Sequence, residues 1–152
     1  KNIGEERVFL ASTTHGAEMS GLGAMIKTIE VMKENNIVGH LWQYGRKLQN
    51  GMNKISNSLG ISDFFSVVGV PCHPAYICKD STQALSSTFQ TLFSQEMIKH
   101  GVLMPWISLC YMHGETELQK TLTATDKSLR TYAVALQEGP ERFLVGPVVK
   151  IL

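Results

Sequence analysis

The sequence has no cluster of basic residues, no long apolar run and few cysteines. Its 152 residues carry a formal net charge of +1, and this balance argues against a nucleic-acid-binding surface. No apolar stretch reaches the length that crosses a bilayer and no signal peptide opens the chain, so we expect no membrane association. Three cysteines, an odd number, favour reduced thiols and a cytoplasmic location.

The composition that is present fits a folded domain. Hydrophobic residues make up 43% of the chain and charged residues 18%, which is enough apolar surface for a core. A length of 152 residues predicts one domain, or one domain with a tail. The chain begins at Lys1 rather than Met and enters structure within a few residues, so we expect an excised piece of a longer protein.

The most informative stretch is a run of hydroxyl and small residues near the N-terminus. A short apolar strand at residues 8–11 leads into Ser12, Thr13 and Thr14, and a helical pattern follows Gly16. Backbone N–H groups at a helix N-terminus bind anions, and a hydroxyl adds a hydrogen bond to phosphate. The alternative is a plain N-cap, which residue types alone favour.

Apolar periodicity predicts four helices. The first spans residues 17–34, with Glu18 as a capping carboxylate, and the second spans residues 37–59 with Gly60 as its C-terminal cap. A third begins at Asp80 or Ser81 and closes at Gly101, and a fourth opens at Gly114 and stops at Gly139. The third helix is expected to carry the apolar residues Leu85, Phe89, Leu92, Phe93 and Met97.

Three β-rich runs predict the sheet. Residues 64–70 and 75–78 form an antiparallel pair broken at Pro71, and residues 107–111 add a third strand. The fold class is therefore α+β, a small three-stranded antiparallel sheet with helices on one face. The strand at Val8 has no obvious partner, which predicts an interface with a missing domain or a neighbouring chain.

The order of these elements resembles the C-terminal third of class III pyridoxal-phosphate-dependent aminotransferases, in particular the glutamate-1-semialdehyde 2,1-aminomutase-like members. Each motif is weak alone, but their order and spacing are specific together, and they cover the chain to about Gln137. The first motif is the strand, threonine and small-residue turn of residues 9–24, and the second is the helix of residues 37–48, with a Gly before a basic residue and Leu. The third is the strand at residues 66–69. The fourth is the "basic–Gly–Val–apolar–Pro" run of residues 99–105, which is followed by Ser108 and His113-Gly114-Glu115.

The resemblance implies a fold type I transferase architecture, a homodimer and pyridoxal 5'-phosphate as cofactor. In the family, a threonine before the small-residue turn reaches the cofactor phosphate of the other subunit; Thr14 stands at that position, and Thr13 would offer its backbone N–H. Residues 1–36 would contribute to the dimer interface and cofactor site, residues 37–139 would form the small domain, and residues 140–152 the C-terminal tail.

The departures from the family pattern limit what this chain does. The Schiff-base lysine and the aspartate that pairs with the pyridine nitrogen lie upstream of the threonine in the family, so no catalytic residue is assigned here and the piece alone is expected to be inactive. Lys1, Lys27 and Lys33 lack the matching context. No arginine follows residues 107–111 before Arg130, so a clamp for a substrate carboxylate is not supported.

Two functions from different classes stay open. The first is the C-terminal part of an aminotransferase or aminomutase that transfers or migrates an amino group through an aldimine, acting on small-molecule amino donors and acceptors. The second is a stand-alone α+β binding or dimerisation module without chemistry.

Other candidate side chains favour structural interpretations. A metal site is not expected, because the cysteines and histidines show no paired C-x-x-C spacing; the residues concerned are Cys72, His73, Cys78, Cys110 and His113. His15 is either a turn residue or a group near the cofactor ring. Trp106 is expected in the core, with the substrate entrance as the alternative.

Overall fold

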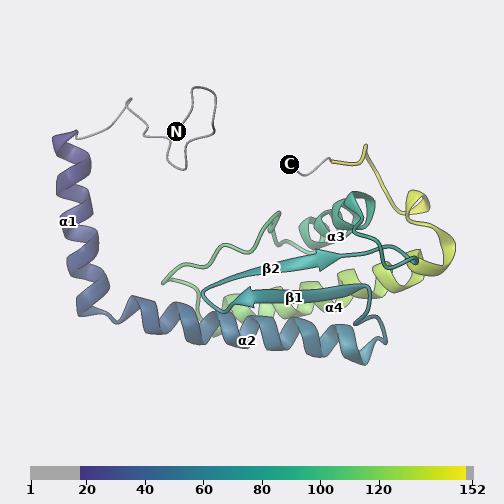
Figure 1. The fold of residues 1–152 in the computed structure, drawn as a ribbon, viewed down its shortest axis with the longest axis horizontal. Coiled ribbons are helices and arrows are strands. Elements are labelled where there is room, and N and C mark those ends of the chain that lie inside the picture. Colours follow the sequence, from purple (N-terminus) through teal and green to yellow (C-terminus); the bar gives the residue numbers. More distant parts are fainter. Residues whose placement is uncertain (1–17, 150–152) are drawn as a thin grey trace, which may run out of the picture. The chain divides into compact units, whose positions relative to one another are not determined.

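A computed structural model describes residues 18–149, and the chain divides into two units at residue 37 (Figure 1). The described part of the first unit is one helix, α1 (Met19–Glu34), which confirms the predicted helix over residues 19–34. It buries none of its side chains, and its apolar residues Leu22, Met25 and Ile26 are exposed. Glu18 stands at its N-cap, but the side chain makes no capping hydrogen bond, so that expectation was wrong. The predicted strand at Val8 lies outside the described residues.

The second unit is built on two long helices and a hairpin. α2 (Ile37–Ser58) and α4 (Glu115–Glu138) confirm the predicted second and fourth helices. Gly60 and Gly139 follow them with φ of 70° and 89°, the left-handed region that glycine adopts without steric cost. A short 3₁₀ turn, η1 (Pro140–Arg142), comes after α4. None of the helices within residues 18–149 is both long and apolar enough to span a bilayer.

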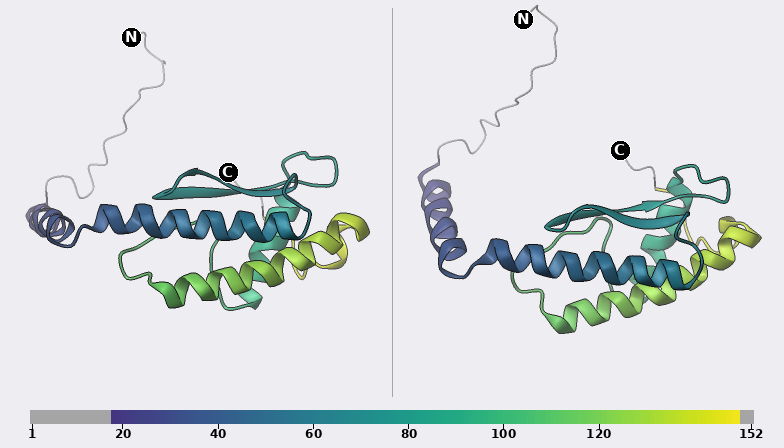
Figure 2. Two further views of the ribbon diagram at one scale, coloured as in Figure 1. Left: turned by 90° about the horizontal axis from the view of Figure 1, so that it is seen from below. Right: turned by 60° about the horizontal axis from the view of Figure 1, so that its bottom comes forward.

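The hairpin consists of β1 (Phe65–Val70) and β2 (His73–Cys78), paired antiparallel. The register sets Phe65 opposite Cys78 and Val67 opposite Tyr76, and these four side chains are buried. They share one face because side chains alternate along a strand. Figure 2 shows α2 and α4 on one side of the hairpin, as a sheet with a single buried face requires.

The predicted third strand is wrong for residues 107–111, since the described part of the chain holds a sheet of two strands. The segment passes β2 without ladder pairing. Its approach is fixed by a side chain instead: the Tyr76 hydroxyl donates to the carbonyl oxygen of Pro105 at 2.6 Å. Pro105 has no N–H for a ladder, and the next turn is closed by the N–H of His113, which donates to the Cys110 carbonyl at 3.2 Å.

The third helix begins later than predicted. α3 (Ser87–Lys99) is capped by Ser86, whose hydroxyl accepts from the N–H of Phe89 at 3.3 Å. Asp80 forms a turn of its own, because its Oδ1 accepts from the N–H and hydroxyl of Thr82 at 2.8 and 2.6 Å. These hydrogen bonds lower the pKa of Asp80. Leu85, predicted on this helix, therefore lies in the loop before it and is 78% exposed.

An aromatic cluster forms the centre of the core. The ring of Phe93 on α3 lies 4.8 Å from that of Phe65 and 5.0 Å from that of Tyr76. Phe89 lies 4.7 Å from Tyr132 of α4. The Tyr132 hydroxyl accepts from the N–H of Lys79 at 2.9 Å and lies 2.6 Å from the carbonyl oxygen of the same residue. The cluster thus joins both strands to α3 and α4.

The outer edge of β1 is closed by side chains of α2. The amide of Asn53 both donates to the carbonyl of Val67 at 2.9 Å and accepts from its N–H at 2.7 Å. The Ser56 hydroxyl donates to the Phe65 carbonyl at 2.7 Å, and Gln49 donates to Val67 at 3.2 Å. Residues 49, 53 and 56 repeat at helical spacing, so one face of α2 takes the place of a neighbouring strand.

Replacing Asn53 by leucine keeps the side-chain volume but leaves the Val67 N–H without its partner. We expect this variant to lose about 1–3 kcal/mol of the free energy of unfolding, the cost of a buried unsatisfied backbone group. Urea unfolding followed by circular dichroism measures the loss. The control is Asn50→Leu, an exposed amide on the same helix; equal losses in the two variants would show that the edge bonds contribute nothing.

Candidate functional site

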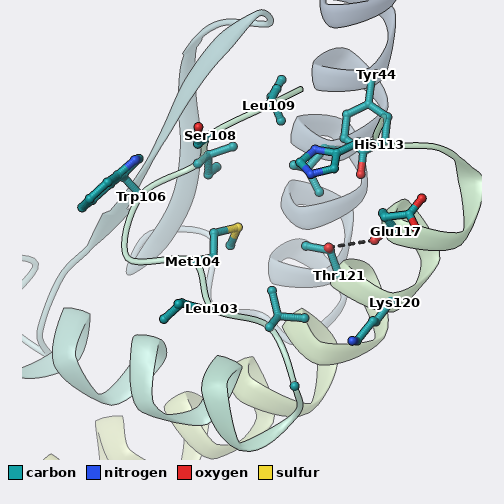
Figure 3. Close-up of a pocket in the computed structure, with 14 residues that line it drawn as sticks. Tyr44, Leu103, Met104, Trp106, Ser108, Leu109, His113, Glu117, Lys120 and Thr121 are labelled. Carbon is teal, nitrogen blue, oxygen red and sulfur yellow. Dashed lines mark hydrogen bonds between the residues drawn. The ribbon is translucent and has the colours of Figure 1, made fainter. Parts of the chain in front are cut away.

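A hollow of about 270 Å³ lies between α2, the segment of residues 101–109 and the first turns of α4 (Figure 3). Its walls are apolar on the side of Leu48 and the connecting segment, and polar on the side of α4. The polar members are Tyr44, Ser108, His113, Glu117, Lys120 and Thr121. His113 lies close to Glu117, Lys120 and Thr121 because α4 begins directly after the turn that carries His113.

His113 is held by its own turn. The ring Nδ1 of His113 accepts from the backbone N–H of Cys110 at 3.3 Å. The backbone N–H of His113 donates to the carbonyl oxygen of Cys110. A ring nitrogen that accepts carries no proton, so the proton of a neutral His113 resides on Nε2. The ring lies 5.6 Å from that of Tyr44. The turn therefore fixes the tautomer and leaves Nε2–H as a donor.

Tyr44 supplies the second aromatic wall. It is buried on α2, and burial followed by the negative charge of Glu117 raises the pKa of its phenol. The phenol therefore stays protonated at neutral pH and keeps its capacity to donate. Its ring also lies 6.0 Å from that of His40, whose Nε2 is buried with no hydrogen-bond partner among the described residues.

Glu117 is committed to the start of α4. Its Oε2 accepts from the N–H of Gly114 at 2.8 Å, and this bond lowers the pKa of the carboxyl. A carboxylate in the first turn also suits the helix dipole. The Thr121 hydroxyl donates to the backbone carbonyl of Glu117 at 2.8 Å, drawn as a dashed line in Figure 3. The side chain of Lys120 is exposed and places a positive charge at the rim of the hollow.

The arrangement can bind a molecule with an apolar arm and a hydrogen-bonding end. Val102, Met104 and Leu109 offer contacts to the arm. Tyr44 and His113 offer donors to the polar end. Glu117 is a poor general base here, because its carboxylate is already held as a cap. The site thus has the character of a binding wall rather than of a complete reaction centre.

The cysteines and histidines that the structure describes do not gather into a metal site. Cys78 is buried, Cys72 is half-buried and Cys110 is exposed. Among residues 18–149 there is no group of three histidine, cysteine, aspartate or glutamate side chains that could hold an ion.

The predicted site residues separate into two sets. Thr13, Thr14 and His15 lie outside the described residues, and their roles stay predictions. Trp106 was expected in the core, but it is 69% exposed and lines the hollow; the alternative, a place at the substrate entrance, stays a prediction. Sequence reasoning missed Tyr44, which fits the apolar stripe of α2 and so gave no separate signal. It also missed Thr121, although the spacing of four from Glu117 on one helix was readable.

Comparison with known proteins gives one curated relative and one solved structure. No protein-family model matches the chain. The chain is 30% identical over 127 residues to the 3-aminobutyryl-CoA aminotransferase of Cloacimonas acidaminovorans (strain Evry), a match that covers 82% of this chain and 30% of the relative. The second protein is FumI of Sphingopyxis sp. MTA144 in its PLP internal aldimine form, with a TM-score of 0.64 and 20% identity over 74% of this chain and 27% of that one.

These matches show the fold of the described part and the extent of the likeness. At 20% identity, the likeness to FumI is one of fold. The chain spans less than a third of the length of either protein.

Proposed function

We propose that this chain is the C-terminal part of a pyridoxal-phosphate-dependent class III aminotransferase, a cytoplasmic homodimer that acts on small-molecule amino donors and acceptors. The observation that carries the proposal is the 30% identity over 127 residues to an aminotransferase. The fold likeness to an enzyme in its PLP internal aldimine form supports the same cofactor. The relative's activity favours transfer of an amino group. Migration within one substrate is the second candidate, which the resemblance to the aminomutase-like members of the family favours.

The described residues do not form a cofactor site by themselves. Within residues 18–149 every lysine is exposed except the half-buried Lys79. A Schiff-base lysine needs a shielded site that lowers the pKa of its amine. Pyridoxal phosphate, when bound, supplies an electron sink for carbanions. We place its lysine upstream of this chain and derive no step of the reaction from the residues described.

The contribution of this chain is then binding. We propose that Thr14 donates its hydroxyl to the cofactor phosphate of the other subunit and that Thr13 adds its backbone N–H. The exposed apolar residues of α1 support a role for residues 1–36 in the dimer interface. We propose that the hollow beside Tyr44 and His113 forms one wall of the substrate site.

Two of the three arginines within residues 18–149 already pair with carboxylates, and the third, Arg46, is exposed on α2. Arg130 forms two hydrogen bonds to Asp126, at 2.9 and 3.1 Å. Arg142 lies 3.4 Å from Glu138. We therefore propose that this part of the enzyme does not select substrates by a free carboxylate, in keeping with a relative that is named for a CoA thioester.

The Schiff-base assignment is tested by reductive labelling. The 152-residue chain, mixed with pyridoxal phosphate and reduced with borohydride, is expected to show no single lysine labelled in stoichiometric yield. The reason is that the described lysines are exposed, apart from the half-buried Lys79, so none has the shielded surroundings that a Schiff-base lysine needs. Mass spectrometry of a digest reads the result. In the parent protein, one lysine upstream of Lys1 is expected to be labelled; specific labelling within this chain would overturn the domain assignment.

The role of Thr14 is tested in the intact enzyme. Thr14→Ala is expected to weaken cofactor binding by roughly 1.5–3 kcal/mol, the value of a hydrogen bond to a charged group. The dissociation constant then rises about 10- to 150-fold, which a titration of cofactor absorbance measures. Thr14→Ser should largely restore binding, and Ser12→Ala serves as the neighbouring hydroxyl control. An unchanged constant in Thr14→Ala would remove this residue from the site.

A further inference from the structure

The connecting segment of residues 103–109 forms one wall of the hollow with little hydrogen bonding of its own. All of its residues except Pro105 line the hollow, and the segment pairs with neither strand of the hairpin. Among the described residues, its hydrogen bonds come from one side chain: the Tyr76 hydroxyl lies 2.6 Å from the carbonyl oxygen of Pro105 and 3.2 Å from that of Met104. Figure 3 shows Met104 on this segment, across the hollow from Thr121 of α4. The wall therefore depends on a group that does not itself line the hollow.

Tyr76 is held in place by the core. Its ring is buried and lies 6.3 Å from that of Phe65 and 5.0 Å from that of Phe93. Burial raises the pKa of the phenol, so the hydroxyl stays protonated at neutral pH and acts as a donor. Because its proton is directed to the two carbonyls of the segment, the Ser94 hydroxyl, 3.4 Å away, donates to the phenol oxygen. The hydroxyl is thus a donor at a position that β2 and α3 fix.

We propose that Tyr76 is a positioning residue of the candidate site, and that its hydroxyl sets how far this wall stands from α4 and so how tightly the hollow holds a ligand. The other anchors of the segment are the buried side chains of Met104 and Ile107. Apolar burial is non-directional, so these side chains hold the segment against the core without fixing its position along the core surface. A hydrogen bond of 2.6 Å is directional. Without this bond the segment shifts while both side chains stay buried.

Tyr132 supplies a matched comparison within the same core. Its ring is buried, and its hydroxyl lies 2.6 Å from the carbonyl oxygen of Lys79 and 3.1 Å from that of Phe64. None of these three residues lines the hollow. Phenylalanine in place of either tyrosine keeps the ring and removes one hydrogen-bonded hydroxyl, so the two variants are expected to lose similar stability. A change at the site that occurs in only one of them is therefore an effect of position.

Limited proteolysis of the intact enzyme tests the anchoring of the wall. Tyr76→Phe is expected to raise the rate of chymotrypsin cleavage after Trp106 about 3- to 10-fold, because cleavage follows the population of the displaced segment and one lost hydrogen bond changes that population by this factor. Tyr132→Phe should leave this cleavage unchanged. Mass spectrometry identifies the fragments, and far-ultraviolet circular dichroism establishes that both variants are folded. No rise in Tyr76→Phe, or an equal rise in both variants, would overturn the proposal.

The consequence for the site is tested by ligand binding, a step that rests on the proposed function. The probe is 3-aminobutyryl-CoA, for which the curated relative is named, and cofactor absorbance follows its half-reaction with the intact enzyme. Tyr76→Phe is expected to raise the half-saturating concentration about 3- to 10-fold at an unchanged limiting rate, because the hydroxyl touches the wall rather than the reacting atoms. Tyr132→Phe should change neither quantity. A slower limiting rate at an unchanged half-saturating concentration would overturn the positioning role. An intact protein without any absorbance change would instead contradict the proposed function, and cleavage after Trp106 would still decide whether Tyr76 anchors the wall.

Discussion

Replacement of Gly45 by alanine is expected to cost about 3 kcal/mol of the free energy of unfolding, or to prevent folding. A Cβ at this position would lie 1.8 Å from the carbonyl oxygen of Pro71, 2.7 Å from its carbonyl carbon and 2.8 Å from Leu109 Cδ1. The first two are backbone atoms of the turn between β1 and β2, so the hairpin must move away from α2. Gly45 is buried in the middle of a long helix, where glycine is otherwise a poor choice.

Gly51→Ala on the same helix is the matched control. Its Cβ would meet Cδ2 and Cδ1 of Leu122 at 2.6 and 2.9 Å, which are the ends of a half-buried side chain that can change rotamer. Alanine gains up to about 1 kcal/mol of helix propensity over glycine at either site. Urea unfolding should therefore place Gly51→Ala within about 1 kcal/mol of the parent chain and Gly45→Ala far below it. Similar losses in the two variants would contradict the close approach of hairpin and helix.

The second large effect is expected at Phe93. Its side chain is fully buried, and its ring contacts those of Phe65 on β1 and Tyr76 on β2. Phe93→Ala removes these contacts and leaves a cavity, at a cost of about 3–5 kcal/mol of the free energy of unfolding. Thermal and urea unfolding both measure this loss.

Phe93→Leu separates volume from aromatic contact. Leucine refills much of the space, so its cost should be much smaller, about 1–2 kcal/mol. If alanine and leucine lowered the stability equally, the tilted and edge-on ring contacts of Phe93, rather than the filled volume, would hold the core together. If neither variant lost stability, the position would be outside the cooperative core.

The helices were the predictable part of the fold. α2 shows an apolar residue every three or four positions, and α4 opens with Gly114, Glu115 and Glu117 and is followed by Gly139; these local signals survive in the structure. The late start of α3 was not predictable from residue types, because Asp80 suits both an N-cap and an isolated turn. Only the bonds to Thr82 and the cap at Ser86 distinguish the two outcomes.

The third strand shows where local pattern is insufficient. Residues 107–111 have β-forming composition, but a strand exists only when a partner edge accepts it. The segment passes β2 but is tied to it by the Tyr76 hydroxyl rather than by a backbone ladder, a contact between residues twenty-nine positions apart that no window of sequence reveals. Trp106 was misplaced for a related reason. A tryptophan beside a proline is typical of a core position, but Trp106 lies on a connecting segment and is 69% exposed.

The candidate site was the least predictable part. His113 came from a motif, but its fixed tautomer follows from the turn to Cys110, and its neighbour Tyr44 arrives from a helix sixty-nine positions earlier in the chain. Thr14 is a prediction of a different kind, since it depends on a resemblance and on a second subunit. Its test lies in the intact enzyme rather than in the fold of this chain.

The closed edge of β1 also decides how this protein could self-associate through its sheet. Among residues 18–149, the outward carbonyl of Cys78 on β2 accepts from Ser86, and no row of side chains comparable to that of α2 covers Pro74 and Tyr76. A sheet that is open on both edges can extend by adding chain after chain, as fibres do. A hairpin open on one edge can join a single further hairpin, after which neither copy has an edge left. Misassembly through this sheet would therefore stop at a closed pair, and amyloid growth would require α2 to detach first.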